Sequence, residues 1–178
     1  MSERVRGFEV VTKYKGESIE LPNRATKGSA GYDLKAAVNI VVPSIWKALL
    51  ENQGLANLME GNSIKDENKG FLSSTLVPTG VKAYMPEQEY LLLANRSSNP
   101  MKKQLALPNG IGIIDADYYG NSSNEGEIFV QLINYGFEDV KVKKGDRIAQ
   151  GIFTPYEVID NEVSEFQTRI GGFGSSGE

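Results

Sequence analysis

Two carboxylates, Asp115 and Asp117, stand two residues apart directly after the apolar pair Ile113–Ile114. The chain contains no histidine and no cysteine, which excludes histidine-based triads, thiol nucleophiles and nearly all protein-built zinc sites. Aspartate is one of the few general bases that remain. In an extended segment the two carboxylates would share a face, and a bend would separate them. Their spacing fits a catalytic pair and an acidic turn that caps a strand equally well.

A second polar segment, Asn95–Pro100, follows the apolar run Tyr90–Ala94. It combines the guanidinium of Arg96 with the hydroxyls of Ser97 and Ser98, and this set suits phosphate oxygens. The alternative is a polar turn before Pro100.

The segment Gly145–Gln150 leads into the apolar run Gly151–Phe153. We expect Gln150 to point into a β-rich interior, where its amide needs hydrogen-bond partners. A simpler interpretation of this segment is an ion pair between Asp146 and Arg147 at the start of a strand.

The C-terminal segment, Gly171–Glu178, formally matches G-x-G-x-x-G. No helix can follow it, which excludes a dinucleotide fold. We expect residues 164–178 to form a flexible arm whose aromatic ring and backbone N–H groups could close over a base and a polyphosphate. A disordered tail is the alternative.

Short β-type runs separated by Gly, Pro and Asn dominate the chain and have to position these groups. The expected strands are 7–15, 37–42, 75–85 with a turn at Pro78–Gly80, 90–94, 127–135 and 140–143. Runs 90–94 and 127–135 carry apolar residues on both faces, which predicts burial on both sides. The pattern predicts an all-β sandwich, jelly roll or barrel, and 178 residues fit one domain, 1–178.

One segment departs from this pattern, because Ser44–Glu60 reads as a helix. Ser44 is an acceptable N-cap, although Lys47 stands where an acidic residue is expected. A polar loop follows the helix, so residues 44–70 form a predicted helical insert in a β domain. Its apolar face must be buried somewhere, and it consists of Ile45, Trp46, Leu49 and Leu50.

The charge balance limits the partners. Nineteen basic and twenty-three acidic residues give a net charge of -4, which argues against general binding of nucleic acid or anionic membranes. The sequence has no signal-peptide pattern and no apolar run of about 18 residues. These features predict a cytoplasmic protein.

Five segments in this order resemble the five motifs of the homotrimeric dUTP pyrophosphatases, or dUTPases. They are Ala30–Ala36, Asn95–Ser98, Gly112–Gly120, Gly145–Gln150 and Gly171–Gly177. The resemblance implies a jelly-roll trimer that shares its sites among subunits and hydrolyses dUTP to dUMP and pyrophosphate. The long segment between the first two motifs looks like that of phage-encoded dUTPases. This likeness implies a phage-infected bacterial cell as the setting and a repressor-like regulatory partner for insert 44–70.

The resemblance also implies the role of each residue. Asp115 would activate the water that attacks the α-phosphorus, and Asp33 would contact Mg²⁺ through water. Tyr118 would pack on the deoxyribose, and Phe173 would cover the uracil. The implied substrate-binding residues are Arg96, Ser97, Ser98, Asn109, Gly112, Ile114, Tyr118, Gln150, Arg169, Phe173, Gly174 and Ser175. Arg169 stands four residues before Phe173, where the family usually has five.

Two alternatives belong to other classes. The dCTP deaminases share the implied fold, trimer and Arg-Ser-Ser segment, but they rely on a glutamate in the pocket. A regulatory binding module would use the fold only to dock a partner protein.

Overall fold

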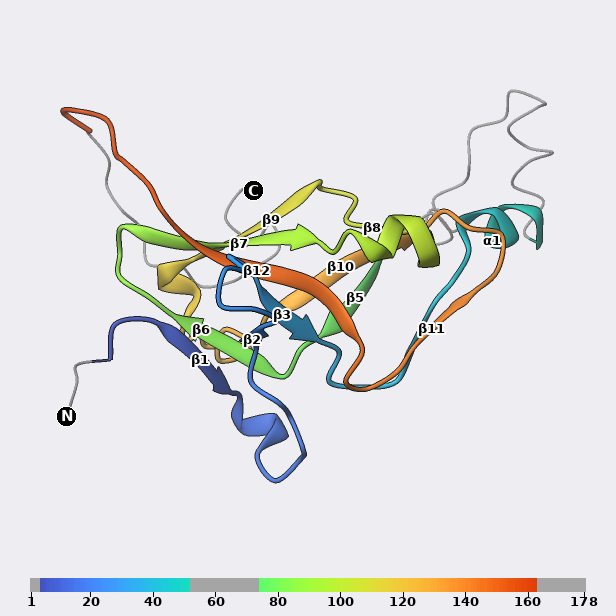
Figure 1. Ribbon diagram of the computed structural model, residues 1–178, viewed down its shortest axis with the longest axis horizontal. Coiled ribbons are helices and arrows are strands. Elements are labelled where there is room, and N and C mark those ends of the chain that lie inside the picture. Colours follow the sequence, from blue (N-terminus) through green and yellow to red (C-terminus); the bar gives the residue numbers. More distant parts are fainter. Residues whose placement is uncertain (1–3, 52–73, 163–178) are drawn as a thin grey trace.

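The computed structural model describes residues 4–51 and 74–162, which are mostly β-strand with a few short helices (Figure 1). The strands are β1 (Gly7–Val10), β2 (Asn23–Arg24), β3 (Tyr32–Lys35), β4 (Ile40–Val42), β5 (Thr75–Pro78), β6 (Val81–Tyr84), β7 (Glu89–Asn95), β8 (Leu105–Ala106), β9 (Ile111–Asp115), β10 (Phe129–Asn134), β11 (Val140–Val142) and β12 (Arg147–Pro155). The helical elements are η1 (Thr12–Tyr14), α1 (Ile45–Glu51), η3 (Asn99–Lys103) and η4 (Ala116–Tyr118). The structure therefore confirms that the chain is mostly β-strand, as the sequence predicts.

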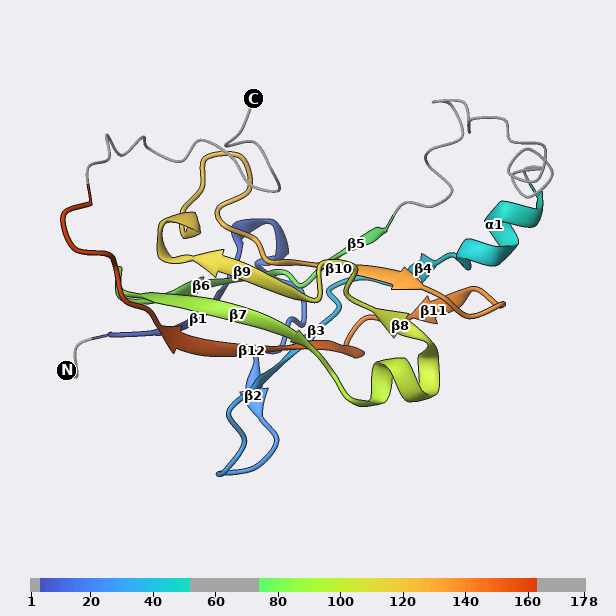
Figure 2. The same ribbon diagram turned by 90° about the horizontal axis from the view of Figure 1, so that it is seen from above.

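The largest sheet is antiparallel and has the strand order β2-β3-β12-β7-β9. Its central strands β12 and β7 run side by side for most of their length (Figure 2). The register places Gln150 opposite both Asp33 and Ala94, and it places Asp115 opposite Tyr90. Since paired residues share a face, this register decides which functional groups meet.

The remaining strands form three smaller sheets, β5-β10-β8, β1-β6 and β11-β4. One hydrophobic core joins all four sheets, and its largest fully buried side chains include Leu34, Leu91, Leu105, Leu132 and Ile148. The expected burial of both faces is wrong for two strands. In β10 buried and half-buried residues alternate, and in β7 Leu92 is only half-buried between buried Leu91 and Leu93. In these two strands, therefore, one face is turned to the core and the other is only half-buried.

Some strand boundaries differ from the sequence expectation. The first strand stops at Val10 rather than at residue 15, because the chain turns into η1 at Thr12 directly after a last bond on the β6 side, from the Val11 N–H to the Gly80 carbonyl at 3.0 Å. The expected run 75–85 is divided into β5 and β6 by the predicted turn, where Gly80 has φ +69°. A positive φ of this kind favours glycine.

Helix α1 begins as predicted at Ser44, a buried residue whose Oγ accepts the Lys47 N–H at 3.2 Å. The acidic group that the sequence lacks near the cap comes from Asp139. Its carboxylate accepts the Ser44 N–H at 3.0 Å and binds Lys47 Nζ at 2.9 Å. The Ser44 N–H and Lys47 lower the pKa of the Asp139 carboxyl. The base of the expected insert is therefore fixed to the loop after β10.

The apolar face of α1 is not fully covered. Trp46 and Leu50 are 43% and 63% exposed, and the Trp46 ring stacks on Phe137 with centroids 6.2 Å apart. Within the described part of this single chain these two side chains are therefore not buried against the β core. The rest of the expected helix and the loop to residue 70 lie outside the described residues. No helix within residues 4–51 and 74–162 is long and apolar enough to cross a membrane.

We predict that Leu132→Ala lowers the free energy of unfolding by about 2–5 kcal/mol, because it removes a fully buried side chain from a packed core. Chemical denaturation measures this loss. The matched control is Met101→Ala, since Met101 is 82% exposed and its truncation should change stability by about 0.5 kcal/mol or less. Equal losses in the two variants would contradict this assignment of the core.

Candidate active site

The centre of the first candidate cluster is Asp33, which is 3% exposed on β3. Its Oδ1 accepts from Arg96 Nε at 3.1 Å, and its Oδ2 accepts from Arg147 Nη1 at 3.2 Å. Arg96 Nη1 also donates to Ser98 Oγ at 3.3 Å. A buried carboxylate requires such pairing, so Asp33 fixes the guanidinium of Arg96 just beyond the end of β7.

Gln150 joins this cluster through the sheet register, because it lies opposite Asp33. A Cβ at Gly31 would lie 3.0 Å from Gln150 Cβ, so the absence of a side chain there makes room for the glutamine. Gln150 is half-buried and shares a face with Ala94, whereas the core residue Leu93 points to the opposite face. The expectation that Gln150 points into the interior is therefore wrong.

The turn that carries Arg96, Ser97 and Ser98 is anchored by a residue that sequence reasoning missed. Asn99 is 1% exposed, and its Nδ2 donates to Asn95 Oδ1 at 2.9 Å and to the Ile148 carbonyl at 2.8 Å. The only signal for this role was its place before Pro100. The segment is thus the polar turn of the alternative interpretation, and it also presents Ser97 to solvent.

The simple ion pair expected as an alternative at the start of β12 is wrong. Arg147 binds Asp33, and Asp146 Oδ2 instead accepts from Lys103 Nζ at 3.5 Å and from the Lys143 N–H at 3.2 Å. Arg147 is half exposed at its side chain, so its contact with Asp33 brings a second cation to the cluster.

The second candidate cluster surrounds Asp115, the last residue of β9. Helix η4 starts at Ala116 and separates half-buried Asp115 from exposed Asp117. Asp115 occupies the N-cap position of η4, but its side chain makes no capping hydrogen bond. The two carboxylates therefore lie on either side of the bend at which β9 ends and η4 begins.

The expected base-reading segment runs from an exposed turn at Asn109 through β9. Its ladder is formed with β7, and it places Gly112 opposite Leu93. A Cβ at Gly112 would lie 3.1 Å from Leu93 Cβ, so glycine permits this close approach. Ile114 packs against the core, which leaves the backbone of β9 as the polar feature of the segment.

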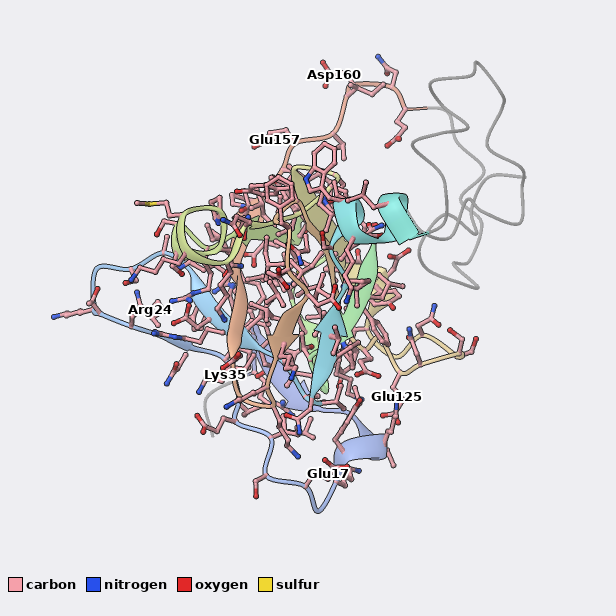
Figure 3. The ribbon with its side chains drawn as sticks, turned by 90° about the vertical axis from the view of Figure 1, so that its right-hand side faces the viewer. Glu17, Arg24, Lys35, Glu125, Glu157 and Asp160 are labelled. Carbon is pink, nitrogen blue, oxygen red and sulfur yellow. The ribbon has the colours of Figure 1, made fainter. Side chains whose placement is uncertain are left out.

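Tyr118 is the last residue of η4, three residues after Asp115, and it is 4% exposed. Its hydroxyl donates to the Glu127 carbonyl at 3.1 Å and accepts from Asn124 Nδ2 at 2.7 Å. Both partners belong to the loop between η4 and β10. Glu125 lies on this loop near η1 (Figure 3), and its carboxylate accepts the Thr12 N–H at 3.1 Å.

The two clusters lie at opposite ends of β7. Asp115 is opposite Tyr90, whereas Arg96 follows the last residue of the strand. Six residues of strand separate these positions by about 20 Å, at about 3.3 Å per residue. The face between them carries Ile111 and Ile113, which are each 49% exposed. Within one chain, the candidate base and the candidate phosphate ligands do not meet.

Four of the expected binding residues, Arg169, Phe173, Gly174 and Ser175, lie outside the described residues, as does the whole expected arm 164–178.

Comparison with known proteins identifies the family. A sequence model of the dUTPase family matches residues 69–177. The deoxyuridine 5'-triphosphate nucleotidohydrolase of Lactococcus lactis subsp. lactis (strain IL1403) is 43% identical over 175 residues, which are 98% of this chain and 99% of the relative. This chain belongs to the dUTPase family. Its activity is the hydrolysis of dUTP, that of a dUTP diphosphatase. The deaminase and the purely regulatory module are therefore set aside.

Solved structures agree with this assignment. The dUTPase from Streptococcus mutans is 41% identical, with a TM-score of 0.69, and the match covers 87% of this chain and 99% of that one. A dUTPase of Staphylococcus bacteriophage 80alpha, a G164S mutant with dUpNHpp, covers 99% of this chain at a TM-score of 0.61. It is only 19% identical, so this likeness to a phage protein extends to the fold alone.

The D95N mutant dUTPase from phage phi11 of S. aureus, which is 18% identical to this chain, coordinates a structural Mg(II) ion. Within residues 4–51 and 74–162 no group of three or more His, Cys, Asp or Glu side chains could hold a metal ion. Both oxygens of Asp33 are engaged by guanidinium groups. These residues do not fit a protein-built metal cage, but they fit Mg²⁺ held mainly by phosphate oxygens and water, with Asp33 reached through water.

A buried acid beside Tyr118 allows a test of the loop. Glu127 is 3% exposed, and its Oε1 accepts the Gly80 N–H at 3.2 Å. Burial raises the pKa of the Glu127 carboxyl above its ordinary value of 4.5, and the hydrogen bond from Gly80 opposes this effect. The protonated acid is therefore favoured more strongly in the folded chain than in the unfolded chain.

We predict that Glu127→Gln is more stable than the wild type at neutral pH and that the difference shrinks in acid. The contribution of Glu127 to stability is complete below about pH 4.5 and is lost as the pH rises through its raised folded pKa. Glutamine keeps the acceptor for Gly80 and does not titrate. Urea unfolding of both proteins between about pH 4 and pH 7 measures the difference. A difference that is the same at every pH would contradict a raised pKa.

Proposed function

We propose that Asp115 is the general base of dUTP hydrolysis. It takes a proton from a water molecule whose oxygen bonds to the α-phosphorus, while the bond from the α-phosphorus to the bridging oxygen breaks and pyrophosphate leaves. Two features support this role, namely the half-buried position of Asp115 at the end of β9 and the absence of histidine and cysteine from the chain.

The phosphate ligands in this proposal are Arg96, Ser97, Ser98 and Gln150. Arg96 supplies a fixed guanidinium, because Asp33 holds its Nε, and such forks bind phosphate oxygens strongly. Mg²⁺ carried by the triphosphate supplies charge neutralisation when it is bound. Asp33 reaches it through water, while its main work is to hold the two arginines in place.

At the other end of the nucleotide, the backbone of Asn109, Gly112 and Ile114 reads the uracil edge, and Tyr118 forms the wall against the deoxyribose. The polar groups of the β9 backbone and the rigid, buried Tyr118 ring support this arrangement. Arg169, Phe173, Gly174 and Ser175 complete the proposal as ligands from the arm.

The observation that carries the proposal for the assembly is the separation of Asp115 from Arg96 by about 20 Å. We infer a homotrimer of jelly-roll subunits, in which Asp115 of one subunit meets the Arg96 cluster of another and the arm of the third. The exposed Ile111 and Ile113 lie on the face between the clusters, where subunit contact would bury them. Exposed apolar patches of this kind mark interaction sites.

We predict that Asp115→Asn lowers kcat for dUTP by about 10²-fold or more, because an amide keeps the size of the side chain but cannot accept the proton. Pyrophosphate release measures turnover, and calorimetric titration with a non-hydrolysable dUTP analogue should show that binding survives. The matched control is Asp117→Asn, since Asp117 is exposed beyond the bend. Near-normal turnover by the Asp115 variant would remove this residue from its role.

A mixing experiment tests the shared site. Asp115→Asn and Arg96→Ala proteins should each be nearly inactive, but trimers re-formed from an equal mixture should recover about a quarter of the wild-type rate. Half of the subunits then offer an intact Asp115 and half an intact Arg96, so one pairing in four combines both. Either variant mixed with itself and treated in the same way is the control. Without recovery, in mixtures shown to contain mixed trimers, both groups must come from one subunit.

The phage origin and the docking of a repressor-like protein through residues 44–70 remain predictions. The part of this segment that the structure describes is anchored by Ser44 and Asp139. An experiment that removes the insert therefore should begin after α1, so that this anchor is kept.

A further inference from the structure

We propose that Asn124 is a positioning residue for sugar selectivity, because it holds Tyr118 in a place that leaves no room for a 2′-hydroxyl. The inference rests on the proposed role of Tyr118 as the wall against the deoxyribose. It concerns the loop 120–127, which joins η4 to β10.

The hydroxyl of Tyr118 is held from two sides by this loop. Asn124 Nδ2 donates to it at 2.7 Å, and the hydroxyl donates to the Glu127 carbonyl at 3.1 Å. The ring itself is 4% exposed. To move away from the sugar, Tyr118 would have to break both bonds, and the Glu127 carbonyl would lose the hydroxyl as its partner in a buried place, which is costly.

The loop can serve as a support because it is itself tightly fixed. Asn124 Oδ1 accepts the Gly126 N–H at 3.0 Å, and a Cβ at Gly126 would lie 2.4 Å from the Tyr118 carbonyl oxygen. Gly126 has φ +83°, so glycine is required there on two grounds. The loop therefore lies directly against the backbone of Tyr118.

A second set of contacts ties the loop to the rest of the chain. The Glu125 carboxylate accepts from the Thr12 N–H at 3.1 Å and from Lys82 Nζ at 3.3 Å, and Glu127 Oε1 accepts the Gly80 N–H. These partners belong to η1, β6 and the turn before β6. Asn124 thus connects a loop that is held in place by these bonds to the phenol of Tyr118, which limits the space beside C2′ of the sugar.

The geometry assigns the two ends of the Asn124 side chain to different tasks. Oδ1 closes the loop on Gly126, and Nδ2 fixes Tyr118. Asn124→Asp keeps an oxygen for Gly126 but offers the Tyr118 hydroxyl an acceptor in place of a donor. Because the hydroxyl has one proton, it can then bond either this carboxylate or the Glu127 carbonyl, so one of its two bonds is lost. Asn124→Ala removes both polar ends of the side chain. A matched control is Ser123→Ala, which removes a hydroxyl that donates to Asn121 Oδ1 at 2.6 Å within the same loop.

The experiment measures kcat/KM for dUTP and for UTP in the wild type and in the Asn124→Asp, Asn124→Ala, Ser123→Ala and Tyr118→Ala proteins, with melting temperatures alongside. We expect the ratio of dUTP to UTP to fall about tenfold in both Asn124 variants, mainly through faster use of UTP. Ser123→Ala should keep the wild-type ratio even if its melting temperature falls.

Three outcomes overturn the inference, and they differ in what they say of the proposed function. If the dUTP-to-UTP ratio of kcat/KM is unchanged in Asn124→Asp but falls in Tyr118→Ala, the role of Asn124 is rejected and that of Tyr118 is kept. If this ratio falls as much in Ser123→Ala as in the Asn124 variants, the effect belongs to the loop as a whole and not to Asn124. A wild-type ratio that survives in Tyr118→Ala rejects Tyr118 as the wall, and the inference is rejected with it.

Discussion

The antiparallel register of β7 determines how far apart the proposed general base and the proposed phosphate ligands lie in one chain. Strand β7 pairs with β12 on one side and β9 on the other, and residue 90 lies opposite Asp115 while Arg96 follows the far end. A slip by one residue would move every side chain of the strand to the other face, and the buried Leu91 and Leu93 prevent that. The same hydrophobic pattern that fixes the fold therefore fixes the separation of base and phosphate ligands.

Charge is handled differently at the two ends of the strand. Asp33 is buried between two guanidinium groups, so this cluster carries excess positive charge around one ordered carboxylate, as the proposed binding of a polyphosphate would require. A buried ion pair of this kind adds little net stability, but it fixes the direction of Arg96. At the Asp115 end, the hydrogen bonds of buried Tyr118 with Asn124 and with the Glu127 carbonyl hold the loop after η4 in place.

The sequence was sufficient for the mostly β fold, the turn at Gly80 and the cap at Ser44, because each depends on local spacing or on a single residue type. It also indicated Asp115 and Arg96 by their chemistry. It could not indicate that Asp33 pairs with Arg96 and Arg147, which are 63 and 114 residues away. The role of Asn124 was hidden for a related reason, since a polar loop shows its purpose only when the buried hydroxyl that it contacts is known. The end of the first strand was misjudged because the turn of η1 at Thr12–Tyr14 has no glycine or proline to mark it in the sequence.

The anchored start of α1 has a consequence for how this family can vary. Ser44, Lys47 and Asp139 fix the first turn of the helix to the loop after β10, and β5 begins again at Thr75 inside a sheet. The two ends of the connection from α1 to β5 are therefore held independently of each other, one by a cap and an ion pair and the other by strand pairing. We expect the described fold on either side to tolerate a change in the length of chain between residues 51 and 75. Descendants of one enzyme could lengthen, shorten or replace this stretch while the two ends of β7 stay as they are.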